Sequence, residues 1–143
     1  MNSLKTLFVV PEIRLDSAPY HFPFWAGILA AIVEEKKGQV AVLDLNAMRA
    51  RYNGQQVPNK IIQEEIASEK WDLIGIGGLT TTYSRIKELA PLIRKNSPDS
   101  IFVGGGGWST YNPHEILELI PELDLLVLGE GEETFSELYD EID

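Results

Sequence analysis

The sequence predicts a doubly wound α/β domain, in which helices cover both faces of a five-stranded parallel sheet. Five short apolar runs recur along the chain, and segments with helical periodicity separate them. Each run is continuously apolar, which is typical of strands buried on both faces. Alternating strands and helices form parallel sheets through right-handed crossovers, so few topologies remain. We expect the flavodoxin-like strand order 2-1-3-4-5, a Rossmann-like arrangement.

Strands and helices can be assigned in chain order. The expected strands are Leu7–Val10, Val40–Leu43, Leu73–Ile76, Ile101–Val103 and Leu125–Leu128. Pro23 could open the first helix and Gly38 could end it, and Asn112 with Pro113 marks a later helix start. Two further helices follow from apolar residues spaced i, i+3, i+4 and i+7: Ile86, Leu89, Ala90 and Ile93, then Phe135, Leu138, Tyr139 and Ile142. The polar segment Ala47–Pro58 is expected to be a long connection, either a flap or slack.

Composition limits what the chain can do. Its 143 residues suit one domain, so 1–143 is expected to be a single unit. A net charge of −10 without clustered Lys or Arg argues against nucleic acid as a partner. No apolar run could cross a bilayer and no secretion signal precedes the first strand, so we expect a cytoplasmic protein without a membrane partner. The absence of cysteine excludes disulfides and iron–sulfur ligation within this chain.

The first loop at the carboxyl edge of the predicted sheet is long and aromatic. Ligands of such sheets bind at this edge, where strand order reverses. Residues 12–25 include Tyr20 and His21 as candidate ligand contacts, beside Phe22, Phe24 and Trp25. An aromatic, uncharged loop suits a large and mostly apolar ligand. The alternative is that these rings pack under the first helix.

The loops after the third and fourth strands are rich in glycine. Gly77-Gly78-Leu79-Thr80-Thr81 offers bare backbone and hydroxyls, although Thr81 or Thr82 could simply cap a helix. Four consecutive glycines, ending in Gly105-Gly106-Gly107, precede Trp108. A planar ring or amide lying against the main chain would explain them. A phosphate cradle is the rival, but the chain has neither a Walker lysine nor G-x-G-x-x-G in its first crossover.

The last loop is Gly129-Glu130-Gly131-Glu132-Glu133. Acidic residues at a helix amino terminus favour its dipole, which is a purely structural explanation. Glu130 and Glu132 could instead form an acid–base pair, but no nucleophile or metal ligand accompanies them in the sequence. We therefore expect no catalytic residue here, and treat Gly129, Glu130 and Gly131 as candidate ligand contacts.

Together these loops resemble the cobalamin-binding domain that precedes the catalytic barrel of many radical S-adenosylmethionine enzymes. The resemblance runs through Val42–Asn46, Asp72–Ile76 and Val103–Thr110, and its most specific stretch is Leu128–Phe135. It implies a cobalamin-binding module with cobalamin as cofactor, whose nucleotide tail enters the carboxyl edge. The partner is then a downstream domain that holds S-adenosylmethionine and an iron–sulfur cluster. Relatives include methyltransferases and the anaerobic magnesium-protoporphyrin ester cyclase group.

The resemblance also assigns residues, and the chain departs from it twice. Gly105-Gly106 is expected to line the tail pocket, and Gly77-Gly78-Leu79 stands where many cobalamin domains have Ser-x-Leu. Thr80 or Thr81 could replace the missing serine hydroxyl. The cobalt-ligating pattern Asp-x-His-x-x-Gly is absent, because Asp16 and His21 are too far apart. Many radical-enzyme relatives hold cobalamin without a protein ligand below the metal, so we expect no metal ligand.

Two other classes of function remain to be weighed. A docking or regulatory domain with this fold that has lost the cofactor is favoured slightly by the two departures. A signalling receiver would need an acidic pocket and a phosphorylatable aspartate after the third strand, where this chain has glycines and threonines. A flavin- or nucleotide-binding enzyme stays open on fold grounds alone.

Overall fold

The strands form one parallel sheet with the order β2-β1-β3-β4-β5, which confirms the predicted topology. The computed structural model describes residues 3–16, 18, 21–110 and 112–143. The strands are β1 (Lys5–Val10), β2 (Gln39–Asp44), β3 (Leu73–Gly77), β4 (Ile101–Gly105) and β5 (Leu125–Val127). Because β1 pairs with both β2 and β3, the chain changes its direction of winding between β1 and β3. Ligand sites of such sheets lie at this point, outside the carboxyl ends of the strands.

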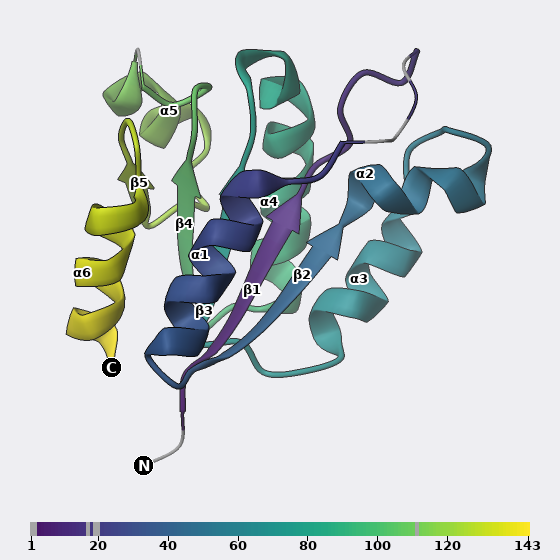
Figure 1. Cartoon of the computed structure of the whole chain (residues 1–143). Helices are drawn as coiled ribbons and strands as arrows, with labels where there is room; N and C mark the ends of the chain where they lie inside the picture. Colours follow the sequence, from purple (N-terminus) through teal and green to yellow (C-terminus); the bar gives the residue numbers. More distant parts are fainter. Residues whose placement is uncertain (1–2, 17, 19–20, 111) are drawn as a thin grey trace.

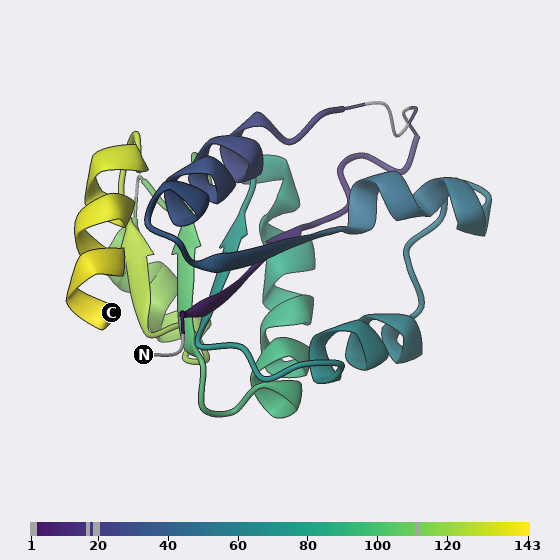
Figure 2. The same cartoon turned by 60° about the horizontal axis from the view of Figure 1, so that its bottom comes forward.

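Helices cover both faces of the sheet (Figure 1). One face carries α1 (Phe24–Glu35) and α6 (Glu132–Ile142), and the other carries α3 (Asn59–Ala67), α4 (Tyr83–Asn96) and α5 (Pro113–Leu119). Figure 2 shows α1 and α3 on opposite sides of β1. Each face has its own apolar cluster, with Phe8 in one and Leu7 in the other. Alternate residues of a strand point to opposite faces, so one buried strand supplies both clusters.

The periodic segments form the predicted helices, but two helix ends differ from expectation. Pro113 begins α5 as expected, whereas the Asn112 side chain makes no capping hydrogen bond. The residue in the left-handed conformation after α1 is Lys37, with φ of 62°, rather than Gly38. Glycine is needed at position 38 for packing, because a Cβ there would lie 2.7 Å from Cγ1 of Val33 and would overlap the Tyr139 hydroxyl.

The segment after β2 is folded, so the expectation of a slack connection is wrong for its first half. It contains α2 (Leu45–Met48) and the 3-10 helix η1 (Arg49–Tyr52). The Asp44 carboxylate caps α2 by accepting a hydrogen bond from the backbone N–H of Ala47 at 2.9 Å. The side chain of Arg49 is fully buried and donates from Nε to the carbonyl oxygen of Gly54 at 2.9 Å. A polar segment thus folds around a buried guanidinium.

Candidate functional site

A cavity of about 560 Å³ opens at the carboxyl edge of the sheet, on the face covered by α1 and α6. Its volume lies within the range of about 300–1,000 Å³ that is usual for small-molecule sites. The carboxyl ends of β1, β3, β4 and β5 contribute to its walls, together with the amino-terminal turns of α1 and α6. The cavity therefore lies where the topology predicts a ligand site.

The two helices that cover this face, α1 and α6, contact each other at their carboxyl-terminal ends. There the Lys36 ammonium pairs with the Asp140 carboxylate at 2.6 Å, and Tyr139 of α6 packs against Gly38. The cavity opens at the opposite, amino-terminal ends of the helices, between Phe24 of α1 and Glu132 of α6. The helix pair thus forms a cleft over the sheet that is shut at one end.

Strand register arranges the cavity wall in rows across the sheet. Phe8, Gly75 and Val103 are successive partners in one row. Two residues nearer the carboxyl edge, Gly77, Gly105 and Val127 form the next row. Both rows line the cavity, and the loops after β3, β4 and β5 extend it to the surface.

The four glycines after Val103 divide into two kinds. Gly104 and Gly106 are required by the fold. A Cβ on Gly104 would lie 2.8 Å from the Trp108 ring, and one on Gly106 would lie 2.6 Å from the Gly78 carbonyl oxygen. Gly106 also has φ of +106°, a conformation that side chains oppose.

The fold does not require glycine at the other two positions, 105 and 107. A Cβ on Gly105 would find only ordinary contacts with Val127, at 3.4 Å and beyond, and one on Gly107 would meet nothing within 4 Å. The fold alone therefore explains two of the four glycines. The bare backbone at 105 and 107 is available to a ligand, because both residues line the cavity.

Aromatic rings surround the cavity at two levels. Inside, the Phe8 ring meets the Trp25 ring edge-on at 6.0 Å and lies 5.5 Å from the Phe135 ring. At the mouth, Phe22 and Phe24 contact each other at 5.1 Å and are 66% and 72% exposed. The alternative that these aromatics pack beneath the first helix thus holds for Trp25, while the exposed Phe22 ring touches α1 at Gly27, 3.3 Å from where a Cβ would be.

The structure brings most of the predicted contact residues to this cavity, and Tyr20 lies outside the described residues. Thr80 and Thr81 instead line a second, more open cavity of about 410 Å³ at the mouth. That cavity also includes Arg14, His21 and Leu79, so His21 lies where the two cavities meet. The predicted residues that line the larger cavity are His21, Gly77, Gly78, Leu79, Gly105, Gly106, Gly107, Gly129, Glu130 and Gly131.

Trp108 lines neither cavity. Its ring is buried in the cluster on the opposite face of the sheet and packs against Gly104. Its indole Nε1 donates a hydrogen bond to the Gly105 carbonyl oxygen at 2.6 Å. Trp108 therefore supports the glycine segment from behind.

Sequence reasoning missed the strand and helix residues that form the inner wall, namely Phe8, Val103, Val127 and Phe135. In the sequence they have the apolar pattern of ordinary core residues, whereas the loops carry the glycines and polar groups typical of a ligand site. Gly75 was the available signal, because glycine inside a buried strand often marks a close approach. Here the Phe8 ring lies over it, 2.8 Å from where its Cβ would be.

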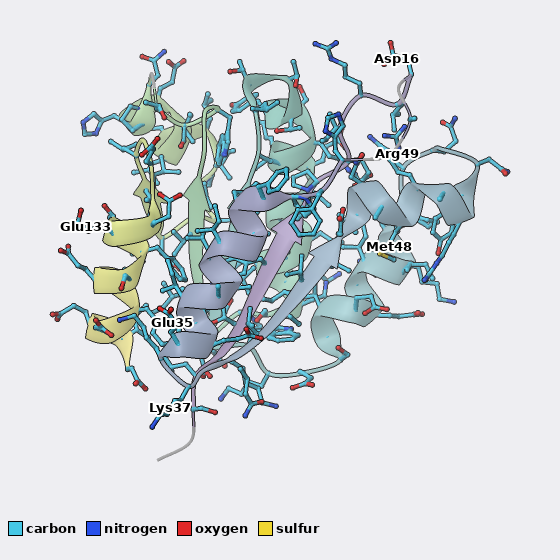
Figure 3. The ribbon with its side chains drawn as sticks, viewed as in Figure 1. Asp16, Glu35, Lys37, Met48, Arg49 and Glu133 are labelled. Carbon is cyan, nitrogen blue, oxygen red and sulfur yellow. The ribbon has the colours of Figure 1, made fainter. Side chains whose placement is uncertain are left out.

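A buried polar group fastens the first loop to the rest of the domain. Glu12 is 4% exposed, and its Oε2 pairs with Arg85 of α4, at 2.8 Å to Nη2 and 3.0 Å to Nε. The next residue, Ile13, donates its N–H to the Asn46 side chain at 3.0 Å, and Asn46 also accepts from Arg49 at 3.0 Å. Figure 3 shows Arg49 below the loop that carries Asp16. The start of the loop is thus held at two points.

Charges at the cavity are few and negative. Glu130 and Glu132 line it and are exposed, whereas Glu133 projects from the outer side of α6 (Figure 3). Among the lining residues there is no Lys or Arg. In the part of the chain that the structure describes, no cluster of His, Cys, Asp or Glu could hold a metal ion, and no helix is long and apolar enough to span a membrane. This cavity offers little to a free phosphate.

The chain belongs to the B12-binding domain family, which matches residues 13–139. It is similar to two proteins named anaerobic magnesium-protoporphyrin IX monomethyl ester cyclase. Identity to the Synechocystis sp. protein is 39% over 66 residues, covering 46% of this chain and 13% of that protein. Identity to the Rubrivivax gelatinosus protein is 26% over 143 residues, covering 98% of this chain and 25% of that protein. The chain thus spans a quarter or less of these relatives.

The fold also matches part of a solved radical S-adenosylmethionine enzyme. The methyltransferase TsrM from Kitasatospora setae, solved with cobalamin and a [4Fe-4S] cluster, superposes with a TM-score of 0.79. Identity is 23%, and the match covers 98% of this chain and 26% of that one. At this identity the likeness shows a common fold.

Proposed function

We propose that this chain is the cobalamin-binding module of a radical S-adenosylmethionine enzyme. Residues 1–143 form one domain, and a downstream domain carries S-adenosylmethionine and an iron–sulfur cluster. The observation that carries the proposal is the open cavity at the carboxyl edge, walled by bare glycine, in a chain of the B12-binding family. The similarity to the cyclases and to TsrM supports the assignment to radical enzymes.

The residues present fit this cofactor. Gly105 and Gly107 leave backbone exposed where the fold does not require it. A nucleotide tail entering between α1 and α6 would lie along these glycines and between the inner aromatic rings. The corrin, with its many amide side chains, would cover the mouth, where Thr80, Thr81 and His21 line the second cavity. Their hydroxyl and imidazole groups can hydrogen-bond such amides.

When bound, cobalamin supplies methyl transfer or another cobalt-centred reaction. The chain's own part is to bind, orient and shield it. Phe22 and Leu79 from the loops and Phe24 from the start of α1 form an exposed apolar rim that would lose contact with water when a large ring covers it. The Glu12–Arg85 pair holds the first loop in place for this contact.

The alternative hypothesis, that the domain has lost its cofactor, is less well supported than cobalamin binding. A pocket no longer under selection for a ligand would be expected to fill with side chains, because buried voids are destabilising. Here about 560 Å³ stays open. The departure at Gly77 also has a local reason, since a Cβ there would come within 3.1 Å of the Trp25 ring.

The test is a titration of the chain with hydroxocobalamin, followed by desalting and visible absorption. We expect one equivalent of retained corrinoid whose spectrum shows the lower base detached from cobalt. The Ala41→Leu variant is a control, because it enlarges an exposed side chain of β2 on the face away from the cavity. Loss of all colour from a chain that circular dichroism shows to be folded would overturn the proposal.

A further inference from the structure

The inner end of the cavity is apolar as well as aromatic. Its walls at this depth are Phe8, Val103, Leu29 and Phe135, with the Trp25 ring at the side. Phe8 and Phe135 are 1% and 3% exposed. A flat aromatic group could contact these rings edge-on or with an offset, as they contact each other.

Hydrogen-bonding groups are scarce at this depth. The backbone of β1, β3 and β4 is paired within the sheet, so its N–H and C=O groups are occupied. Among the lining side chains, the indole N–H of Trp25 is the polar group that the inner walls offer, and it only donates. Thr82 also lines the cavity, but it is buried in the 3-10 helix Thr80–Thr82 and its hydroxyl donates to the Leu79 carbonyl oxygen at 2.6 Å. His21, Glu130 and Glu132 belong to the loops and helix start at the mouth, and Thr6 lies one row below Phe8 and does not line the cavity.

We propose that this inner wall selects the corrinoid by the polarity of its lower base. Dimethylbenzimidazole, the base of cobalamin, is flat and carries two methyl groups that suit apolar walls. Adenine in the same place would bring an amino group, for which these walls offer no acceptor, and several ring nitrogens, of which the single indole N–H of Trp25 could serve only one. Buried polar groups left unpaired discriminate far more strongly than a change of apolar volume. This inference rests on the proposed function, in which the nucleotide tail occupies the cavity.

The test compares two corrinoids that differ in the lower base alone. The chain is titrated in parallel with hydroxocobalamin and with the corrinoid that carries adenine instead, and Kd is measured by equilibrium dialysis. We expect cobalamin to bind at least about tenfold more tightly, because one buried polar group left without a hydrogen-bond partner reduces affinity by about this factor. Equal Kd values, or tighter binding of the adenine form, would overturn the inference and leave the proposed function standing. If neither corrinoid binds, the proposed function fails and this inference falls with it.

A pair of variants locates the selectivity at the inner wall. Val103→Thr keeps the shape of the side chain and adds a hydroxyl inside the cavity, so the ratio of the two Kd values should fall by at least about threefold. Val9→Thr makes the same change at a buried strand residue on the opposite face, and should leave the ratio unchanged. Because each ratio compares two ligands on one protein, a loss of stability common to both titrations cancels. If the ratio of the two Kd values were unchanged in Val103→Thr, this wall would not determine the selectivity for the lower base.

Discussion

Gly105 offers the cleanest perturbation of the proposed site. It lies on β4 with the same orientation as Val103, so a side chain at 105 would extend into the cavity. The nearest atoms to its Cβ would be the Val127 carbonyl oxygen at 3.4 Å and Cβ at 3.7 Å, which are ordinary contacts. Since glycine within a strand costs roughly 0.5–1 kcal/mol relative to alanine, Gly105→Leu should fold with unchanged or slightly greater stability.

The effect of Gly105→Leu on binding can be estimated from packing. Overfilling a well-packed site costs about 1–3 kcal/mol. That range corresponds to a rise in the Kd for hydroxocobalamin of roughly fivefold to 150-fold. Equilibrium dialysis measures the Kd, and thermal unfolding confirms that the variant is folded. Wild-type affinity in the folded variant would refute the placement of the ligand in this cavity.

Gly106 serves as the contrast, one residue further along. Its φ of +106° and the 2.6 Å approach of a Cβ to the Gly78 carbonyl oxygen predict that Gly106→Ala loses about 1–3 kcal/mol of folding stability. A stability loss at 106 without one at 105 is therefore the expected pattern, read from urea unfolding of both variants. Equal stability of both would show that the division of the glycines is mistaken.

Four further predictions address the mouth, the first loop and the closed end of the cleft. His21→Ala should leave the visible spectrum of the bound corrinoid unchanged, because the cobalt-ligating motif is absent; loss of an imidazole-coordinated spectrum would instead make His21 the cobalt ligand. Arg85→Ala should lower the free energy of unfolding by about 3–5 kcal/mol, because Glu12 would stay buried and unpaired. Lys36→Ala, which breaks an exposed pair with Asp140, should cost less than about 1 kcal/mol in the same urea experiment, and equal losses would contradict this ranking. Burial, and then the charges of Asp143 and Asp72, raise the pKa of Tyr139, so its neutral form stabilises the fold below about pH 10 and this contribution is lost as pH rises through the raised pKa. Above about pH 10 the free energy of unfolding should therefore fall more steeply with pH in the wild type than in Tyr139→Phe, and parallel profiles would exclude the effect.

The fold was predictable because its signals are local. Continuous apolar runs and periodic helices identify elements within a dozen residues, and chirality rules restrict how they connect. The carboxyl-edge loops followed from the same topology, which is why the glycine segments were assigned to the site. The folded segment after β2 was missed because a single buried arginine, Arg49, organises it. Nothing in the sequence distinguishes a buried arginine from an exposed one, since Arg usually lies at the surface.

The inner wall was hidden for a different reason. Phe8 and Val103 satisfy every criterion for core residues and are buried, yet they also line the cavity. On the face covered by α1 and α6, a strand residue is part of the core if a helix lies over it. It lines the site if it lies where the two helices are separated. Which of these holds depends on where α1 and α6 meet, and Gly38, Tyr139 and the Lys36–Asp140 pair bring them together far along the chain from the loops.

The shape of the site therefore depends on contacts that lie outside it. The closed end of the cleft sets the gap between the amino-terminal ends of α1 and α6, and the gap exposes the Phe8–Gly75–Val103 row. Trp108 acts from the opposite face, where its ring requires glycine at 104 and its indole N–H holds the carbonyl oxygen of Gly105. A binding surface of bare backbone has no side chains of its own to hold it in place. Its geometry has to come from such neighbours, so residues that never line the cavity decide whether a ligand can lie against its glycines.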